Sequence, residues 1–290
     1  MFNRVADGMK RYEAYAMGDP KAERLPLWIK PDKKIAVHDV MELMRDHFEG
    51  TPMDMTQDVG AGPFHCPYRW RPMEFEVDGK KYIHERATST QQTGFSFVAQ
   101  CRRWLPNPVG GILWFGVDDT YSTCYCPMFC CIDSVPLCFR EGNGSMSQYS
   151  PTAAFWLFNR VSNFCYLRYD VMIQDVRAIQ KGYEEYFIST VNKLNSDATP
   201  TELTALSHQL AQKMMDGWND LDHFLLTRYI DGNIKYLRKV DPYSSVLPST
   251  IDSFIETTPT GVVRFPQQPP YPDWFYRAIV DDHGDILQVK

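Results

Sequence analysis

The pattern of hydrophobic and polar positions predicts a helical start, a central group of strands and a long helical second half. A stripe at helical spacing opens the chain, with apolar residues at Phe2, Val5, Met9, Tyr12 and Ala16. The turn at residues 18–20 ends this first predicted helix. A second helix is predicted from Val37 to Phe48, with Gly50 as the glycine that closes it. Residues 51–72 hold prolines and glycines without a sustained period and predict a long irregular loop.

Five strands are predicted between residues 75 and 132. Two alternating runs surround Asp78-Gly79, a pair that tolerates positive φ angles, so residues 75–83 predict a hairpin. Three further strands are predicted at 95–100, 112–117 and 121–132, and the middle one is apolar on both faces. We expect the five strands to form the structural centre of the molecule, with the strand at 112–117 in the middle.

Two helix starts are predicted in the second half of the chain. Ser150-Pro151 is typical of an N-cap followed by proline, and predicts a helical stretch to about Phe187. Thr199 and Glu202 predict a capping box that opens a second helix, or pair of helices, to about Leu237. The apolar face of this second stretch is formed by Leu203, Leu206, Leu210, Met214, Leu221 and Leu225. After it the sequence becomes rich in Pro and Thr, which predicts an extended tail along the surface.

Strands followed by helices predict an α+β fold in which helices cover a largely antiparallel sheet. The predicted layout has a helical part at 1–50, a strand core at 67–135, a helical layer at 150–238 and an extended C-terminal segment at 239–290. This layout supplies one sheet and one layer of helices.

Composition narrows the class of protein. Of the 290 residues, 44% are hydrophobic and 14% aromatic, as in ordered globular proteins. No apolar run approaches the roughly 18 residues that a membrane span needs, so we expect no membrane partner. The net charge of −6 and the scattered Lys and Arg residues argue against a nucleic-acid partner. An exported and a cytoplasmic location both stay open.

Several long strings in the sequence are rich in rare residues. Residues 90–100 read TQQTGFSFVAQ, and residues 110–123 read GGILWFGVDDTYST. Five shorter strings are FNRVADG at 2–8, LPLWIK at 25–30, MRDHFEGTPMDM at 44–55, PYRWRP at 67–72 and AFWLFN at 154–159. In this order they resemble the dipeptidase A family, cysteine hydrolases of the N-terminal-nucleophile class. Strings of this length and composition seldom recur by chance.

The resemblance implies a four-layer α-β-β-α fold and hydrolysis of dipeptides by the thiol of an N-terminal cysteine, without a cofactor. Every match falls in the second half of such proteins, and this sequence starts Met1-Phe2-Asn3. We therefore expect the C-terminal portion of a dipeptidase that is inactive by itself, because the first residue's thiol and amino group do the chemistry in this class. The expected partners are the dipeptide substrate and the missing N-terminal half, and a homo-oligomer stays open.

Arg86 is the first candidate for substrate binding or oxyanion stabilisation. It precedes the Thr-rich entrance of a predicted strand, where a fixed positive charge would stabilise a thiolate or a peptide carboxylate. Alternatively, it pairs on the surface with Glu85 or Glu76.

Five more candidates flank the predicted strands. The amide and hydroxyl donors of Gln91, Gln92 and Thr93 would face substrate at the mouth of the strand, or else belong to an exposed strand ladder. Asp118 and Asp119 follow a buried run, where a carboxylate would bind the substrate's amino group; alternatively, they form a polar turn.

The cysteines suggest packing rather than chemistry. Of the eight cysteines, five lie in one segment, namely Cys124, Cys126, Cys130, Cys131 and Cys138. Their spacing does not match paired zinc ligands, so we predict no metal site and interpret most of them as small buried hydrophobic residues. Disulfides would be possible in an exported protein.

Two other functions stay open. One is a non-catalytic polypeptide, either a truncated product or a subunit that needs an N-terminal half in trans. The other is a peptide- or glycan-binding module, suggested by aromatic residues such as Trp70, Trp104, Trp114 and Trp156.

Overall fold

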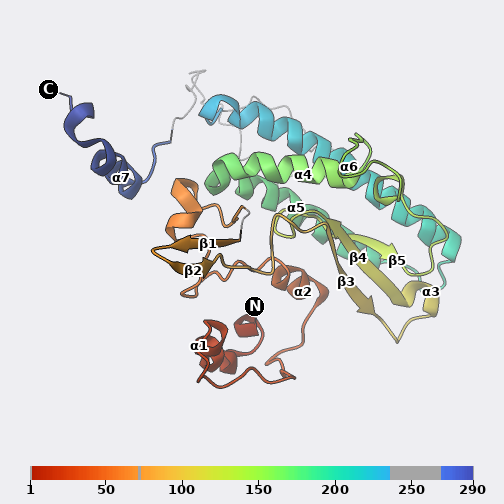
Figure 1. Ribbon diagram of the computed structural model, residues 1–290. Coiled ribbons are helices and arrows are strands. Elements are labelled where there is room, and N and C mark those ends of the chain that lie inside the picture. Colours follow the sequence, from red (N-terminus) through yellow and green to blue (C-terminus); the bar gives the residue numbers. More distant parts are fainter. Residues whose placement is uncertain (1, 71–72, 236–268, 290) are drawn as a thin grey trace, which may run out of the picture.

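A computed structural model describes residues 2–70, 73–235 and 269–289 (Figure 1). The chain opens with three short helical pieces, the 3₁₀-helices η1 (Phe2–Arg4) and η2 (Asp7–Tyr12) and the α-helix α1 (Glu13–Ala16). The prediction of one continuous helix up to Met17 is therefore wrong, because the extended backbone at Ala6 interrupts it. The stripe still packs, since Ala6, Met9 and Tyr12 form a small core against Ile29.

The second helix, α2 (Val37–Leu43), is shorter than predicted. Its start is fixed by Asp39, whose carboxylate accepts a hydrogen bond from the backbone N of Ala36 (2.8 Å). The prediction that it continues to Phe48 is wrong, because Phe48 has a left-handed backbone with φ of 65°. The predicted loop after it is confirmed over residues 51–70, with one short 3₁₀-helix, η3 (Val59–Phe64), inside it.

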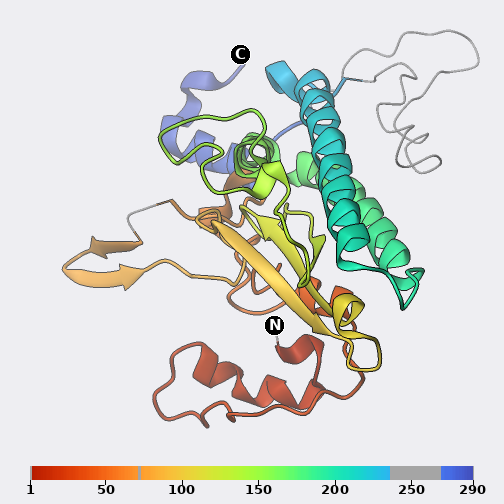
Figure 2. The same cartoon turned by 90° about the vertical axis from the view of Figure 1, so that its right-hand side faces the viewer.

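The predicted hairpin is confirmed as β1 (Glu74–Val77) and β2 (Lys80–Ile83). Both turn residues have positive φ, 50° at Asp78 and 72° at Gly79, as the Asp-Gly pair predicts. However, this hairpin forms a sheet of its own, and its strand residues are exposed. Figure 2 shows it projecting away from the other strands, so the prediction of one five-stranded centre is wrong.

The central sheet has three antiparallel strands in the order β3 (Phe95–Cys101), β4 (Gly111–Val117) and β5 (Cys126–Phe129). A short helix, α3 (Asn107–Gly110), connects the first two. As predicted, β4 lies in the middle. The third strand is shorter than predicted, because residues 118–125 form a turn before it.

The covered face of the central sheet packs against a layer of helices (Figure 1). The layer consists of α4 (Ala154–Cys165), the 3₁₀-helix η5 (Tyr166–Arg168), α5 (Tyr169–Asn192), α6 (Pro200–Tyr229) and the 3₁₀-helix η6 (Ile230–Gly232). Val98, Ile112 and Trp114 point into this core and are at most 5% exposed. Helices on one face of an antiparallel sheet confirm the α+β class.

The two predicted helix starts differ in outcome. The capping box of α6 is confirmed: Glu202 N donates to Thr199 Oγ1 (3.3 Å), and Thr199 N donates to Glu202 Oε2 (2.8 Å). The predicted N-cap at Ser150 is wrong, since α4 starts at Ala154. Ser150 instead donates its hydroxyl hydrogen to Asn143 Oδ1 (2.6 Å), within a loop that includes the 3₁₀-helix η4 (Leu137–Phe139). The second predicted helix ends earlier than expected, at Tyr229, because the backbone leaves helical geometry at Ile230 (ψ of 149°). The expected end near Leu237 itself lies outside the described residues.

The C-terminal residues differ from the predicted extended tail. Residues 273–283 form helix α7 (Asp273–His283), followed by the 3₁₀-helix η8 (Gly284–Leu287). Pro272 precedes this helix and Asp273 stands in its first turn, two features that favour a helix start. The proline-rich segment before residue 269 lies outside the described residues. Within the described residues, every helix is too short or too polar to cross a membrane.

The second face of the central sheet is open on β3 and β4. Its side chains, here called the open patch, are Phe95, Phe97, Ala99 and Leu113. Phe95 is 60% exposed, Phe97 50% and Leu113 37%. Next to the patch, the ring of Phe139 packs edge-on against Phe115, with ring centroids 5.2 Å apart. The 137–139 segment thus covers this face at Phe115 of β4.

Candidate functional site

The segment that carries Arg86 links the hairpin to β3, and Arg86 is exposed on it. The neighbouring Glu85 lies 3.4 Å from the guanidinium of another residue, Arg69, which is itself buried. Because Glu85 already contacts the buried Arg69, an ion pair between Glu85 and Arg86 would compete with that contact. Arg86 is accessible to a ligand, and a substrate role for it stays a prediction.

Gln91, Gln92 and Thr93 lie in a turn just before β3 rather than in its ladder, which starts at Phe95. The backbone N of Thr93 donates to the carbonyl of Thr90 (3.1 Å) and closes the turn. The hydroxyl of Thr90 also donates to the side-chain carbonyls of Gln91 and Gln92, while the amide of Gln91 donates to the backbone carbonyl of Arg69. The alternative of exposed ladder residues is wrong, and the three residues form one compact polar turn.

Asp118 follows β4 with a left-handed backbone, φ of 66°, and is only 1% exposed. Both carboxylate oxygens accept hydrogen bonds from α4, one from Asn159 Nδ2 (2.7 Å) and one from Ser162 Oγ (2.6 Å). Burial raises the pKa of Asp118 to about 6, although the two donors act in the opposite direction. The side chain thereby joins the end of β4 to the helical layer.

Asp119 is fully buried and organises the turn after β4. Its Oδ1 accepts from Ser89 Oγ (2.8 Å) and from the backbone N of Tyr121 (3.0 Å), and its Oδ2 accepts from the hydroxyl of Tyr166 (3.1 Å). Its backbone carbonyl accepts from the backbone N of Thr123 (2.9 Å). This geometry favours the polar-turn alternative for Asp118 and Asp119, and binding of a substrate amino group by the pair stays a prediction.

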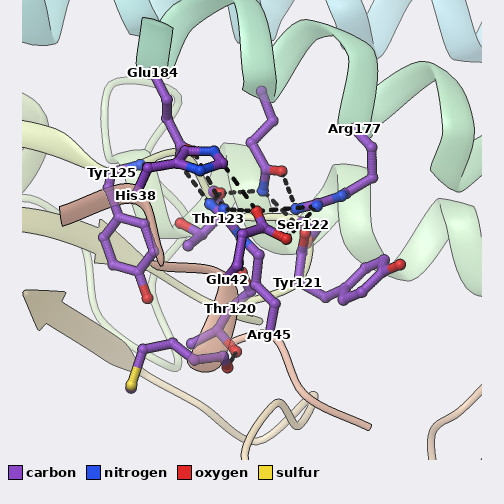
Figure 3. Close-up of polar contacts among 12 residues, drawn as sticks. His38, Glu42, Arg45, Thr120, Tyr121, Ser122, Thr123, Tyr125, Arg177 and Glu184 are labelled. Carbon is purple, nitrogen blue, oxygen red and sulfur yellow. Dashed lines mark hydrogen bonds and ion pairs between the residues drawn. The ribbon is translucent and has the colours of Figure 1, made fainter. Parts of the chain in front are cut away.

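A buried ion pair holds the same turn from the other side (Figure 3). Arg45 follows α2, is 1% exposed, and places its Nη2 2.5 Å from Oε1 of Glu184 on α5. Its Nε and Nη2 also donate to the backbone carbonyls of Thr120 and Thr123, each at 3.2 Å. Burial opposes the charge of Arg45, but the Glu184 carboxylate outweighs it, so the pKa of Arg45 lies above its ordinary value.

A second carboxylate, the half-buried Glu42, lies next to this ion pair. Glu42 lies 2.7 Å from Arg45 and 2.8 Å from Arg177 of α5. Burial opposes its charge, but the Arg177 and Arg45 guanidinium groups hold the pKa of Glu42 below its ordinary value. Glu184 Oε1 also accepts from the backbone N of Tyr125 (3.0 Å). Residues 118–125 are thus tied to α2, α4 and α5 at once.

A cluster of aromatic side chains fills the space beside Asp119. The rings of Tyr68 and Tyr166 lie 4.6 Å apart, and the buried ring of His47 lies 4.7 Å from that of Tyr121. Burial raises the pKa of Tyr68 and of Tyr166 well above the ordinary value, and the nearby Asp119 charge adds to the effect. Both hydroxyls therefore stay protonated, and the hydroxyl of Tyr166 donates its hydrogen bond to Asp119.

A pocket of about 360 Å³ lies beside the segment that carries Arg86. One wall is the N-terminal helical part, another is formed by side chains between Asp46 and Met53, and Thr88 also lines it. Ser89 connects the pocket to the turn described above: its backbone N donates to the carbonyl of Asp46 (3.2 Å), while its hydroxyl donates to Asp119. The pocket and the buried turn thus share one short segment of chain.

A match to peptidase family C69 spans residues 2–182 and includes the turn, the pocket and all six candidate residues. The chain belongs to peptidase family C69. The predicted resemblance is thereby confirmed.

Two relatives of this C69 chain are named as dipeptidases. A probable dipeptidase from Latilactobacillus sakei is 23% identical over 214 residues, which cover 72% of this chain and 41% of the relative. A probable dipeptidase B from Lactococcus lactis subsp. lactis is 23% identical over 139 residues, which cover 48% of this chain and 25% of the relative. The chain therefore spans less than half the length of these relatives.

The cysteines of the C69 chain are all free thiols. Burial raises the pKa of Cys66 to about 11 and that of Cys138 to about 12, and it holds the pKa of Cys124, Cys126 and Cys165 above the ordinary value as well. Burial therefore disfavours the thiolate that nucleophilic attack requires. Cys101 and Cys130 are exposed. Among the described residues, no three Cys, His, Asp or Glu side chains gather as metal ligands would.

Sequence reasoning missed Arg45, Glu42 and Glu184 as parts of the site. One signal was present for Glu184. It shares the buried face of α5 with Val176, Gln180, Phe187 and Val191, at helical spacing. A carboxylate on such a face needs a buried cation as partner. The sequence does not reveal which cation, because Arg45 lies 139 positions away.

Proposed function

We propose that this chain is the C-terminal portion of a cysteine-type dipeptidase and works together with an N-terminal half that carries the nucleophile. The family match over residues 2–182 carries the proposal. The names of the two dipeptidase relatives support the substrate class. The share of their length that this chain covers, 41% and 25%, leaves room for a further half.

The proposed reaction has two steps. The thiolate of the N-terminal half attacks the peptide carbonyl carbon, and the C–N bond breaks after a tetrahedral oxyanion has formed. The amine of the second amino acid leaves with a proton, and water then hydrolyses the thioester to release the first. Because the attacking residue's own amino group acts as the base, no histidine base is required.

The buried cysteines support a nucleophile from outside these residues. The buried thiols have raised pKa values, which works against a thiolate near neutral pH. In this proposal the chain contributes positioning instead. Arg86 and the turn of Gln91, Gln92 and Thr93 face the substrate, and Asp118 and Asp119 hold the strand end beneath that turn.

We further propose that the open patch is the face on which the N-terminal half packs. Exposed apolar groups on the β3–β4 face are what a second sheet would cover. The central sheet and its helices would then be two layers of a four-layer α-β-β-α arrangement.

Reconstitution tests this proposal. The purified 290-residue chain is mixed with the N-terminal half of a family C69 relative whose first residue is cysteine, and dipeptide hydrolysis is followed by amine release. We expect no turnover from either part alone. Turnover by the mixture should disappear after thiol alkylation and in a partner with Ser or Ala in place of the cysteine. Turnover by the 290-residue chain alone, lost after alkylation or in Cys101→Ser or Cys130→Ser, would show that an internal thiol is catalytic.

Arg86 is tested in the reconstituted enzyme. Arg86→Ala should lower kcat/KM by roughly 10²-fold if the guanidinium stabilises developing negative charge. Arg86→Lys should restore only part of this, because an ammonium cannot reproduce the planar guanidinium fork. Arg103→Ala, at another exposed arginine, is the matched control and should leave the rate unchanged. Equal rates for Arg86→Ala and Arg103→Ala would return Arg86 to a surface role.

A further inference from the structure

The 360 Å³ pocket beside Thr88 has a chemistry of its own. Most of its wall is apolar, formed by side chains such as Phe2, Met9, Tyr12, Met17, Phe48 and Met53. At this volume it lies at the small end of ligand pockets, which span about 300–1,000 Å³. It therefore suits one apolar side chain and the backbone atoms attached to it, rather than a long peptide.

The charged groups of the lining have a single sign. Glu13 and Asp46 are acidic, and Lys, Arg and His are absent from the residues that line this pocket. Asp46 is 2% exposed and lies 3.3 Å from Arg4, so part of its charge is neutralised. Glu13 is half-buried at the wall and contributes its charge there. An anion inside the pocket would face carboxylates, whereas a primary ammonium would find a complementary charge.

We propose that this pocket binds the amino-terminal residue of a peptide: an apolar side chain against the aromatic and methionine wall, and its ammonium group near Glu13. This inference rests on the proposed function, because it names the substrate residue that such an enzyme would hold. The location of the pocket supports this proposal, since its lining residue Thr88 is two positions along the chain from Arg86. Asp118 and Asp119 already accept hydrogen bonds from side chains of the protein. Another carboxylate is therefore needed to bind the ammonium of the substrate.

Binding to the 290-residue chain is measured by isothermal titration calorimetry with three probes that share one side chain. L-phenylalaninamide carries an ammonium, N-acetyl-L-phenylalaninamide is neutral, and N-acetyl-L-phenylalanine is an anion. We expect affinity to fall in this order, with a Kd about fivefold higher once the ammonium is removed, as for a partly exposed charge pair. Equal affinities for the three probes would overturn the proposal.

Two pairs of variants locate the binding. Ala16→Trp places a large ring in the pocket and should abolish binding, whereas Ala14→Trp, on the same short helix but outside the lining, should not. Glu13→Gln should remove the preference for the ammonium probe, while Glu23→Gln, at an exposed glutamate outside the lining, should keep it. Circular dichroism melting checks that each variant is folded. Unchanged binding in folded Ala16→Trp would place the ligand elsewhere.

A last comparison separates substrate from product. The dipeptide Phe-Ala should bind more tightly than free L-phenylalanine, because in the dipeptide the carboxylate lies farther from Glu13. The reverse order would assign the pocket to the product and overturn the inference. Since binding is measured without turnover, its failure is distinguishable from a failure of the proposed dipeptidase activity.

Discussion

At the scale of single residues, the polar groups that organise this chain are buried and paired across long stretches of sequence. Arg45 and Glu184 are 139 positions apart, and both side chains are 1% exposed. Removing one member of such a pair leaves a desolvated charge without its partner, which costs far more than the loss of a surface pair.

We expect Glu184→Ala to lower the free energy of unfolding by about 3–5 kcal/mol, because the Arg45 guanidinium would remain buried and unpaired. Glu185→Ala is the matched control. The side chain of Glu185 is 64% exposed, and its carboxylate lies 3.9 Å from the ammonium of Lys181. Its loss should cost about 0.5 kcal/mol or less. Urea unfolding of the two variants measures the difference, and similar midpoints would mean that the buried pair contributes little.

Asp118 predicts a pH dependence of stability. Its folded pKa of about 6 lies above the ordinary 3.8, so the folded state holds the proton more tightly than the unfolded chain does. The stabilising contribution of the protonated group is therefore complete below pH 4 and is lost as the pH rises through 6. The total is on the order of 3 kcal/mol. Asp118→Asn should remove this slope, so its stability relative to the native chain should rise between pH 4 and pH 7. Parallel curves would contradict the assignment.

The residue-scale features differ in how far the sequence predicts them. The capping box at Thr199 and Glu202 and the turn at Asp78-Gly79 follow from neighbouring residues and are confirmed. The three-residue turn at Gln91 and the burial of Asp118 depend on partners in other elements, such as Arg69 and Asn159. Local pattern identified the polar segments, but it did not identify what they contact.

At the scale of elements, tertiary contacts override local periodicity. The apolar stripe predicts a helix from Val37 to Phe48, yet α2 ends at Leu43, and the next residues carry Arg45 and His47 into the interior. Likewise, Ser150 binds Asn143 within a loop instead of capping a helix. The central strand β4, by contrast, was predictable because its apolar run reflects burial directly.

The contact between α5 and α6 gives a prediction at this scale. Gly217 of α6 faces Tyr183 of α5 so closely that a methyl group there would overlap the tyrosine hydroxyl and ring. Alanine favours a helix over glycine by about 1 kcal/mol, but overpacking costs about 1–3 kcal/mol. We expect Gly217→Ala to be destabilising overall, as thermal unfolding would reveal. Adding Tyr183→Leu should make the glycine substitution neutral or favourable, and additive losses in the double variant would contradict this contact.

At the scale of the whole molecule, the helices cover one face of the central sheet, while the open patch on the other carries exposed phenylalanines. A patch of this kind is a site of association or of aggregation. The sequence indicated it in advance, because one sheet and one helical layer leave a face uncovered.

We therefore expect the isolated chain to bind a hydrophobic dye and to self-associate, and Phe97→Lys to reduce both. Phe97 is half exposed, so the substitution removes little folded contact and should leave the melting temperature nearly unchanged. Trp28→Lys, at a residue that is 85% exposed away from β3 and β4, is the control and should leave most dye binding in place. In reconstitution, Phe97→Lys should weaken assembly with the N-terminal half at least tenfold, because a charge would then be buried between two sheets. A monomeric native chain without dye binding, or full assembly of Phe97→Lys, would show that the open patch is not the surface that joins the two halves.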